Sequence, residues 1–295
     1  MGITFLILFF SYPAMLSYDI FNYIATSKVL FFYHENPYIV MPIEFAGDPL
    51  LAFTHAANKI ALYGPTWISL TGIPYFLGFG NFIINLFSFK LLVGSFYLAT
   101  TFLMWKISKN IVSVILFAFN PLIVVETLMS GHNDIVMISL LLLSFFTLMR
   151  KKIIFVLLFF SLSIFVKYTT ILLIPIFVYL FWKILKKENI NWKSVFYFSC
   201  ILMFLGFLLS PIREEIYPWY AIWFLPFAFL VPERRILLYV SIAFSFGLLF
   251  RYVPFMLFGT YAGPDPIIKP GVTFIPVFLI LSYFIIKKIW ERIFS

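Results

Sequence analysis

Cysteine is almost absent from the chain, which has one such residue, Cys200, among 295. A single cysteine excludes an intramolecular disulfide and a cage of several thiolates around a metal ion. Cys200 also lies inside an apolar run, "FYFSCILMF". The cysteine content therefore gives no information about the redox compartment.

Charged residues are scarce as well, at 11% of the chain, whereas soluble domains carry roughly 25%. Hydrophobic residues make up 63%, and the mean hydropathy is +1.04. A soluble domain cannot bury that much apolar surface, so the composition predicts a polytopic, all-α membrane protein. Each charge inside an apolar stretch then needs an explanation, because an unpaired charge in the membrane is costly.

The sequence shows no internal repeat, no low-complexity tail and no stretch with the composition of a soluble domain. We therefore expect a single integral membrane domain over residues 1–295. The net charge of +9 does not indicate nucleic-acid binding, because the basic residues form short clusters between apolar runs. Such clusters are typical of cytoplasmic loops.

Apolar runs separated by charged clusters predict about ten membrane spans, several of them shorter than the ~20 residues that a simple span needs. Short spans suggest broken or tilted helices around a cavity. The expected spans are 2–16, 84–105, 111–130, 135–149, 153–166, 170–184, 194–210, 220–231, 236–250 and 273–287. Residues 1–13 also fit a signal peptide, but no basic residue precedes them, so we expect a short first membrane helix, complete or trimmed at its start.

The basic clusters set the expected orientation, because Lys and Arg concentrate in cytoplasmic loops. With the clusters near residues 106, 151, 187, 234 and 288 in the cytoplasm, the ten spans alternate and both termini lie inside. Most acidic residues then fall on or near the opposite side. They are Asp19, Glu35, Glu44, Asp48, Glu126, Asp134, Glu214, Glu215 and Asp265. Acidic residues contribute little to topology, so their clustering indicates a site on the extracytoplasmic face.

The longest connection, residues 17–83, is rich in aromatic residues, proline and glycine, and we expect it to contribute to the active site. Two segments are amphipathic enough to form interfacial helices, "YDIFNYIATSKVLFF" and "DPLLAFTHAANKIAL". The segment 67–80 is interrupted by glycines and a proline. We expect it to be re-entrant or interfacial.

Asp19, in "SYDIFNY", follows the first apolar run at the outer face. A carboxylate beside aromatic residues at the membrane boundary can have a raised pKa and act as a general base toward a hydroxyl group. The alternative is an N-cap for the following helix, and this residue alone does not decide between them.

A second polar break, Gly131-His132-Asn133-Asp134, interrupts two apolar runs. Asp134 can be a helix cap and His132 an ordinary buried polar side chain. Glu126, His132, Asn133 and Asp134 nevertheless bring many donors and acceptors to one depth, on the same face as Asp19. A sugar needs many hydrogen-bond partners, whereas a cap needs one, so we interpret these residues as part of a sugar pocket.

Lys167, in "FVKYTTILLIP", lies between two short apolar runs. Its ammonium group can reach the interface by extending along the helix, or it can bind an anion such as a lipid phosphate. Arg251 and Arg213 are expected at the same face, and Glu214 and Glu215 are candidates to neutralise Arg213.

Aromatic side chains with polar tips gather on the same side, in "YGPTW" and "PWY". Trp and Tyr belts are common at membrane interfaces, so this is one interpretation of Tyr63, Trp67, Trp219 and Tyr220. Stacking on a sugar ring is the other.

The ordered series "SYDIFNY", "ENPY", "YGPTW", "NPLIVVETLMSGHND", "VKYTTILLIP" and "PWYAIWFLP" resembles the polyprenyl-phosphate-mannose-dependent mannosyltransferases of the GT-C superfamily, in particular the archaeal and bacterial α-mannosyltransferase branch. The likeness covers roughly residues 17–230. It implies a GT-C-like integral membrane enzyme that transfers a sugar, here mannose, from a polyprenyl-phosphate carrier to a glycan or lipid-linked acceptor, usually with inversion. The implied location is a prokaryotic plasma membrane, with the active site on the outer face.

In this family an acidic residue of the first outer loop acts as the catalytic base, and Asp19 matches that position. The stretch from Gly131 to Asp134 and Lys167 also match positions of the family pattern. We predict that Asp19 takes the proton of the acceptor and that Lys167, with Arg251, holds the donor phosphate. The remaining predicted substrate-binding residues are Tyr63, His132, Asn133, Asp134, Trp219 and Tyr220.

Many GT-C enzymes have paired acidic residues in this loop, whereas Tyr18 and Ile20 flank Asp19. The sequence thus predicts no specific cofactor and leaves a divalent cation open. A nucleotide-sugar donor is disfavoured, because the chain lacks a Gly-rich phosphate-binding loop. The alternative function is a secondary transporter or a lipid-linked-sugar flippase that uses Lys167 and Asp134 within the membrane.

Overall fold

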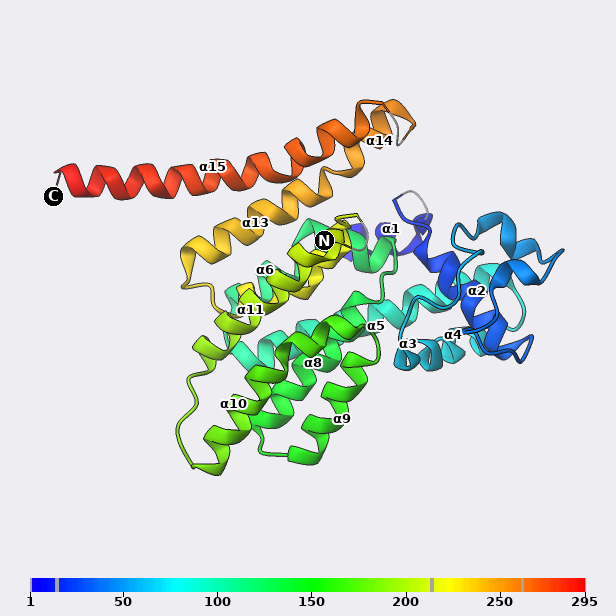
Figure 1. Cartoon of the computed structure of the whole chain (residues 1–295), viewed down its shortest axis with the longest axis horizontal. Coiled ribbons are helices and arrows are strands. Elements are labelled where there is room, and N and C mark those ends of the chain that lie inside the picture. Colours follow the sequence, from blue (N-terminus) through cyan, green and yellow to red (C-terminus); the bar gives the residue numbers. More distant parts are fainter. Residues whose placement is uncertain (1, 14–15, 213–214, 261–262, 295) are drawn as a thin grey trace. The chain divides into compact units, whose positions relative to one another are not determined.

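The computed structural model describes residues 2–13, 16–212, 215–260 and 263–294 (Figure 1). These residues form helices and turns and no strands, which confirms the all-α prediction for the described part. The chain divides into two compact units, Met1–Lys106 with Val124–Ile171, and Ile107–Ile123 with Leu172–Ser295. The prediction of a single membrane domain stays a prediction.

The first unit contains the N-terminal helices, the long connection and a helical hairpin. Its helices are α1 (Gly2–Phe10), α2 (Asp19–Phe31), η2 (Pro42–Glu44), η3 (Pro49–Phe53), α3 (Pro65–Leu70), α4 (Gly72–Leu77), α5 (Phe82–Ser108), η4 (Val125–Met129), α8 (Asp134–Met149) and α9 (Ile153–Ile164). Two short helices, α7 (Pro121–Val124) and η5 (Tyr168–Leu173), lie where the chain passes between the units.

The second unit is also helical. Its helices are α6 (Ile111–Ala118), α10 (Ile174–Leu185), α11 (Trp192–Leu209), η6 (Ser210–Ile212), η7 (Pro218–Trp223), α12 (Leu225–Leu230), α13 (Arg235–Leu249), α14 (Tyr252–Phe258) and α15 (Asp265–Phe294). Helices α13 and α15 pack against each other (Figure 1). They approach closely at Gly247, where an added Cβ would lie 2.3 Å from the carbonyl oxygen of Thr273.

Helices α8 and α9 form an antiparallel pair in the core of the first unit (Figure 1). Their apolar faces meet, and two buried serines join them. Ser144 Oγ donates to the carbonyl of Val156 at 3.0 Å, and Ser163 Oγ donates to that of Met137 at 2.8 Å. These bonds satisfy polar groups that would otherwise be costly to bury. The pair therefore gives the start of α8, where the polar break lies, a rigid support.

Five helices among the described residues are long and apolar enough to cross a membrane, or six if the bent pair Ile111–Ala118 and Pro121–Met129 is one span. The chain is thus a membrane protein by composition and helix length, but the predicted count of ten spans is not confirmed. Several expected spans are shorter helices, including Asp134–Met149 and Ile153–Ile164. The sequence pattern located these apolar helices correctly, while their length falls below that of a simple span.

The long connection is ordered mainly around α2, whose helical structure confirms one of the two predicted helices. The second predicted helix is wrong, because only η3 forms and the chain then continues through turns. Asp48 caps the start of η3 by accepting from the Leu50 amide, and it lies 2.8 Å from Lys28, which holds this part of the connection against α2. Residues 67–80 form α3 and α4 with a break between them, consistent with the predicted interruptions.

Candidate active site

Asp19 is the first residue of α2 and lies at the edge of the first unit. The N-cap of this helix is Tyr18, so the capping interpretation of Asp19 is wrong. A carboxylate in the first helical turn is stabilised by the helix dipole. With 27% of its side chain exposed, Asp19 is accessible to a substrate.

A tight turn brings His132 to Asp19. Gly131 has φ +74, a left-handed conformation that favours glycine, and a Cβ there would lie 3.0 Å from Ile20 Cδ1. His132 is fully buried, with Nδ1 3.5 Å from Asp19 Oδ2 and Nε2 3.2 Å from Glu126 Oε2. The imidazole therefore lies between two carboxylates that come from different parts of the chain.

Glu126 belongs to η4, a five-residue π-helical turn, and is also fully buried. Single π-turns inside helical segments often occur at functional sites, because the extra residue redirects side chains. The two residues are also joined through the backbone, because the His132 amide donates to the Glu126 carbonyl at 2.9 Å. The turn thus fixes both the backbone and the side chain of His132.

The two carboxylates determine the charge of His132. Burial lowers the pKa of an imidazole, but the interactions with Asp19 and Glu126 outweigh burial and raise the pKa of His132 to about 9. His132 is therefore protonated at neutral pH. The imidazolium lies between the carboxyl groups of Asp19, which is partly exposed, and Glu126, which is buried.

The pKa of Asp19 shifts in the opposite direction from our expectation. Burial raises it, but the interactions with His132, the positive charge of Lys167 and the Asn22 amide lower it below its usual value. The expectation of a raised pKa considered only the aromatic surroundings. The cations, which come from segments more than 100 residues away, decide the sign.

Lys167 is paired with Asp134. The ammonium nitrogen lies 2.8 Å from Oδ1 and 2.9 Å from Oδ2 of Asp134, which is fully buried, while 17% of the Lys167 side chain is exposed. Asp134 begins α8, but the N-cap is Asn133, so the capping interpretation is wrong here too. The predicted phosphate-binding lysine thus has a carboxylate partner in this structure.

Asn133 joins this turn to α2 through Tyr23. The Tyr23 hydroxyl donates to Asn133 Oδ1 at 3.3 Å and accepts from the Asn133 amide at 3.4 Å. The Tyr23 ring packs edge-on against Tyr63 and Trp67, with centroids 4.7 and 5.0 Å away. These aromatic rings form one wall of the site.

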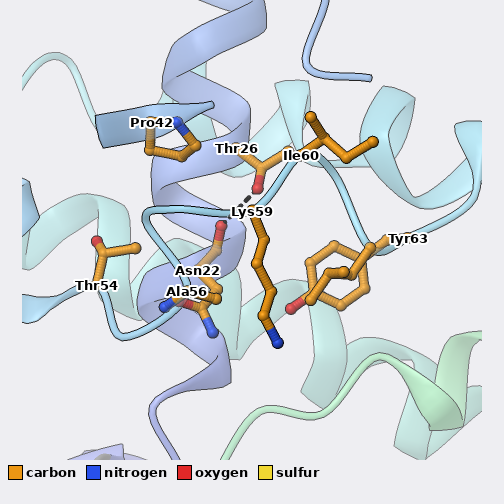
Figure 2. A pocket seen from close by; sticks show the side chains of 9 residues that line it. Asn22, Thr26, Pro42, Thr54, Ala56, Lys59, Ile60 and Tyr63 are labelled. Atoms are coloured by element: carbon orange, nitrogen blue, oxygen red, sulfur yellow. Dashed lines mark hydrogen bonds between the residues drawn. The ribbon is translucent and has the colours of Figure 1, made fainter. Parts of the chain in front are cut away.

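A small pocket opens beside this wall (Figure 2). It has about 10 Å³ of free space, room for one water molecule, and Asn22, Thr26, Lys59 and Tyr63 are among the residues that line it. Asn22 connects the pocket to Asp19, since its amide nitrogen lies 3.5 Å from Asp19 Oδ1 and its amide oxygen accepts from the Ala56 backbone at 3.1 Å.

The structure brings together Asp19, Tyr63, His132, Asn133, Asp134 and Lys167 in the first unit. His132, Asn133 and Asp134 are fully buried, so their role as direct sugar ligands stays a prediction.

Arg251, Trp219 and Tyr220 belong to the second unit and are not placed relative to Asp19. In that unit Arg251 is buried, with Nη2 2.7 Å from Glu215 Oε1, and it also donates to Thr273. The ring of Trp219 stacks on Tyr217, and that of Tyr220 on Trp223. Arg213 and Glu214 lie outside the described residues.

Sequence reasoning missed Asn22, Tyr23 and Lys59. The first two had a detectable signal, because residues three and four positions after Asp19 in a helix lie on its face. The sequence gives no such signal for Lys59, because its position near Asn22 depends on how the long connection folds around α2.

The described residues contain no group of three or more His, Cys, Asp or Glu side chains arranged to hold a metal ion. Asp19 and Glu126 both turn toward His132, on its two ring nitrogens. We therefore derive no step through a divalent cation.

Comparison with known proteins now assigns the chain. No curated protein and no solved structure shows a significant match. A family model described as alpha-(1→6)-mannopyranosyltransferase, N-terminal domain, matches residues 6–183, a range that includes every residue of the cluster around Asp19. Since that range is more than half of the chain, the protein belongs to this mannosyltransferase family.

Proposed function

We propose that the protein transfers mannose from a polyprenyl-phosphate carrier to a glycan or lipid-linked acceptor on the extracytoplasmic face of the membrane. The acceptor oxygen forms a bond with C1 of mannose while the bond between C1 and the phosphate oxygen breaks. Polyprenyl phosphate leaves with the bonding electron pair, and the acceptor proton passes to Asp19. The family description suggests an α-(1→6) linkage. With inversion, an α product requires a β-linked mannosyl phosphate.

The observation that carries the proposal is the row Asp19, His132 and Glu126. The His132 imidazolium lies 3.5 Å from Asp19 Oδ2 and 3.2 Å from Glu126 Oε2, and the lowered pKa of Asp19 keeps it a carboxylate that can take up one proton. Asp19 is the exposed end of the row and the part that an acceptor hydroxyl can reach. His132 and Glu126 act as positioning residues, because they orient Asp19 and keep it ionised.

Lys167 is the proposed partner of the donor phosphate. Its ammonium is held by both carboxylate oxygens of Asp134, and 17% of the side chain is exposed, so a phosphate that reaches it would share the ammonium with Asp134. Asp134 fixes the ammonium in place, which reduces the entropy lost on phosphate binding. Arg251, which is buried in the second unit and paired with Glu215, stays a sequence prediction as a phosphate ligand.

A leaving phosphate needs little activation, so positioning and charge balance supply most of the rate acceleration. In the proposal Asp19 takes up the acceptor proton, and Lys167 faces the negative charge that develops on the phosphate. The family match gives no support to the alternative of a transporter or flippase.

The proposal is tested with the purified full-length chain reconstituted in liposomes. β-Mannosyl-phosphoryl polyprenol carrying labelled mannose is supplied with an α-mannoside acceptor. We expect a labelled α-linked product and the release of polyprenyl phosphate. Transfer from GDP-mannose alone, or no transfer from either donor, would contradict the proposed donor.

A further inference from the structure

Three lysines of the first unit have their ammonium groups bound to other protein groups. Lys28 is ion-paired with Asp48, and Lys90 is fully buried and donates to two backbone carbonyls at the end of α1. Lys167 holds Asp134. None of these three has an ammonium group free to follow a new anion without losing an existing partner.

Lys59 differs from these lysines. It is exposed, and within the described parts of the chain no carboxylate lies within ion-pair distance of it. A lysine has a flexible four-carbon chain and a compact charge, so it can reach an anion that arrives from solvent or membrane. Of these four lysines, Lys59 is thus the one that can bind a new anion without losing an ion pair or a backbone partner.

Lys59 lies on the pocket that adjoins Asp19. Figure 2 shows its side chain extending between Asn22 and Tyr63, with the ammonium at the end toward which the Tyr63 hydroxyl also points. Asn22 is in turn 3.5 Å from Asp19. The pocket itself holds little more than a water molecule, so an anion bound by Lys59 lies at the pocket mouth.

We propose that Lys59 binds the phosphate of the polyprenyl-phosphate donor, an inference that rests on the proposed function. A mannosyl phosphodiester carries one negative charge, and the departing polyprenyl phosphate carries up to two. The charge of Lys167 is balanced by Asp134, so the additional negative charge needs another cation. Lys59 supplies it beside the group that accepts the proton.

The experiment compares wild type with Lys59→Ala and Lys59→Arg in the reconstituted transfer assay. Lys152→Ala is the matched control, because Lys152 is an exposed lysine at the far end of the α8–α9 hairpin. We expect Lys59→Ala to raise the donor KM roughly tenfold, equivalent to about 1.4 kcal/mol, with an unchanged acceptor KM. Lys59→Arg should recover most of the loss, and Lys152→Ala should match wild type.

A binding measurement separates the lipid phosphate from other anions. The affinity of each protein for polyprenyl phosphate is measured in detergent, with phosphatidylglycerol and inorganic phosphate as competitors. We expect Lys59→Ala to weaken polyprenyl phosphate binding by the same factor and phosphatidylglycerol to compete poorly.

Three results would overturn the inference while leaving the proposed function intact. They are wild-type donor KM and product affinity in Lys59→Ala, a rise confined to the acceptor KM, or equal competition by phosphatidylglycerol. Failure of the wild type to use the polyprenyl donor at all would instead refute the proposed function, and the inference with it.

Discussion

Lys167 and Asp134 form a two-point ion pair, with the ammonium nitrogen 2.8 and 2.9 Å from the two carboxylate oxygens. Asp134 is the first residue of α8 and Lys167 follows the end of α9, so the two meet at the open end of the hairpin, where the polar break ends. Asp134 is fully buried, and a buried carboxylate without a partner is costly, so Lys167 offsets the cost of burying it. The pair therefore closes the hairpin and supplies the site with a fixed ammonium group.

Removal of one partner should cost more than removal of both. Lys167→Met leaves a buried carboxylate without its cation and should lower the free energy of unfolding by on the order of 3 kcal/mol. The double variant Lys167→Met, Asp134→Asn removes both charges and should recover most of that stability. Thermal unfolding of the purified proteins measures the difference. Equal unfolding temperatures for the single and double variants would show that the pair is not coupled.

The pH dependence should follow from His132. Its pKa is raised to about 9, so protonation stabilises the folded protein fully below the unfolded value near 6.5, and this contribution is lost as the pH rises through about 9. The lowered pKa of Asp19 affects stability at acid pH. Ionised Asp19 stabilises the folded protein above its unfolded pKa, and this stabilisation is lost as the pH falls through the lowered value. We expect the unfolding temperature to fall between about pH 6.5 and 9, and the transfer rate to fall as the folded protein loses the His132 proton near pH 9.

Glu126→Gln should move that alkaline limit. The variant keeps the shape of the side chain but removes one of the two charges that raise the pKa of His132. The fall in transfer rate should therefore begin at a lower pH than in wild type. Glu188→Gln, which changes an exposed glutamate outside the cluster, is the control. A Glu126→Gln profile that overlays wild type would remove Glu126 from the positioning role.

Topology can be tested with single cysteines, because the native Cys200 is buried. Ala46 lies exposed in the long connection, and Asn189 lies exposed between α10 and α11. We expect a membrane-impermeant thiol reagent to label Ala46→Cys, but not Asn189→Cys, from outside intact cells. Labelling of Asn189→Cys alone would invert the topology and place the site in the cytoplasm.

Much of the site could be predicted because its residues are rare in so apolar a sequence. A charged or polar side chain within such a chain needs a partner, which makes Asp19, His132, Asp134 and Lys167 stand out in the sequence. Their pairing could not be predicted. It depends on contacts between α2 and a turn more than 100 residues later, and on the positive φ of Gly131.

The fold was predictable to a similar extent. Apolar runs in the sequence locate the helices. Whether a helix can span a membrane depends on how many residues are helical without a break, and α8 and α9 are too short for a simple span. The helix predicted after Asp48 is absent for a different reason. Tertiary contacts of Asp48 with Lys28 and Tyr33 hold the connection against α2 and leave only a short 3₁₀ turn.

The central claim is that Asp19 accepts the proton of the acceptor hydroxyl, and Asp19→Asn tests it most directly. The amide keeps the size of the carboxylate and cannot take up the proton. Transfer of mannose from the polyprenyl-phosphate donor is measured for both proteins at saturating donor and acceptor, after equal membrane insertion is established. We predict a rate lower by on the order of 10²–10⁴-fold, with donor binding retained. A rate within a few-fold of wild type would contradict the account and exclude Asp19 as the base.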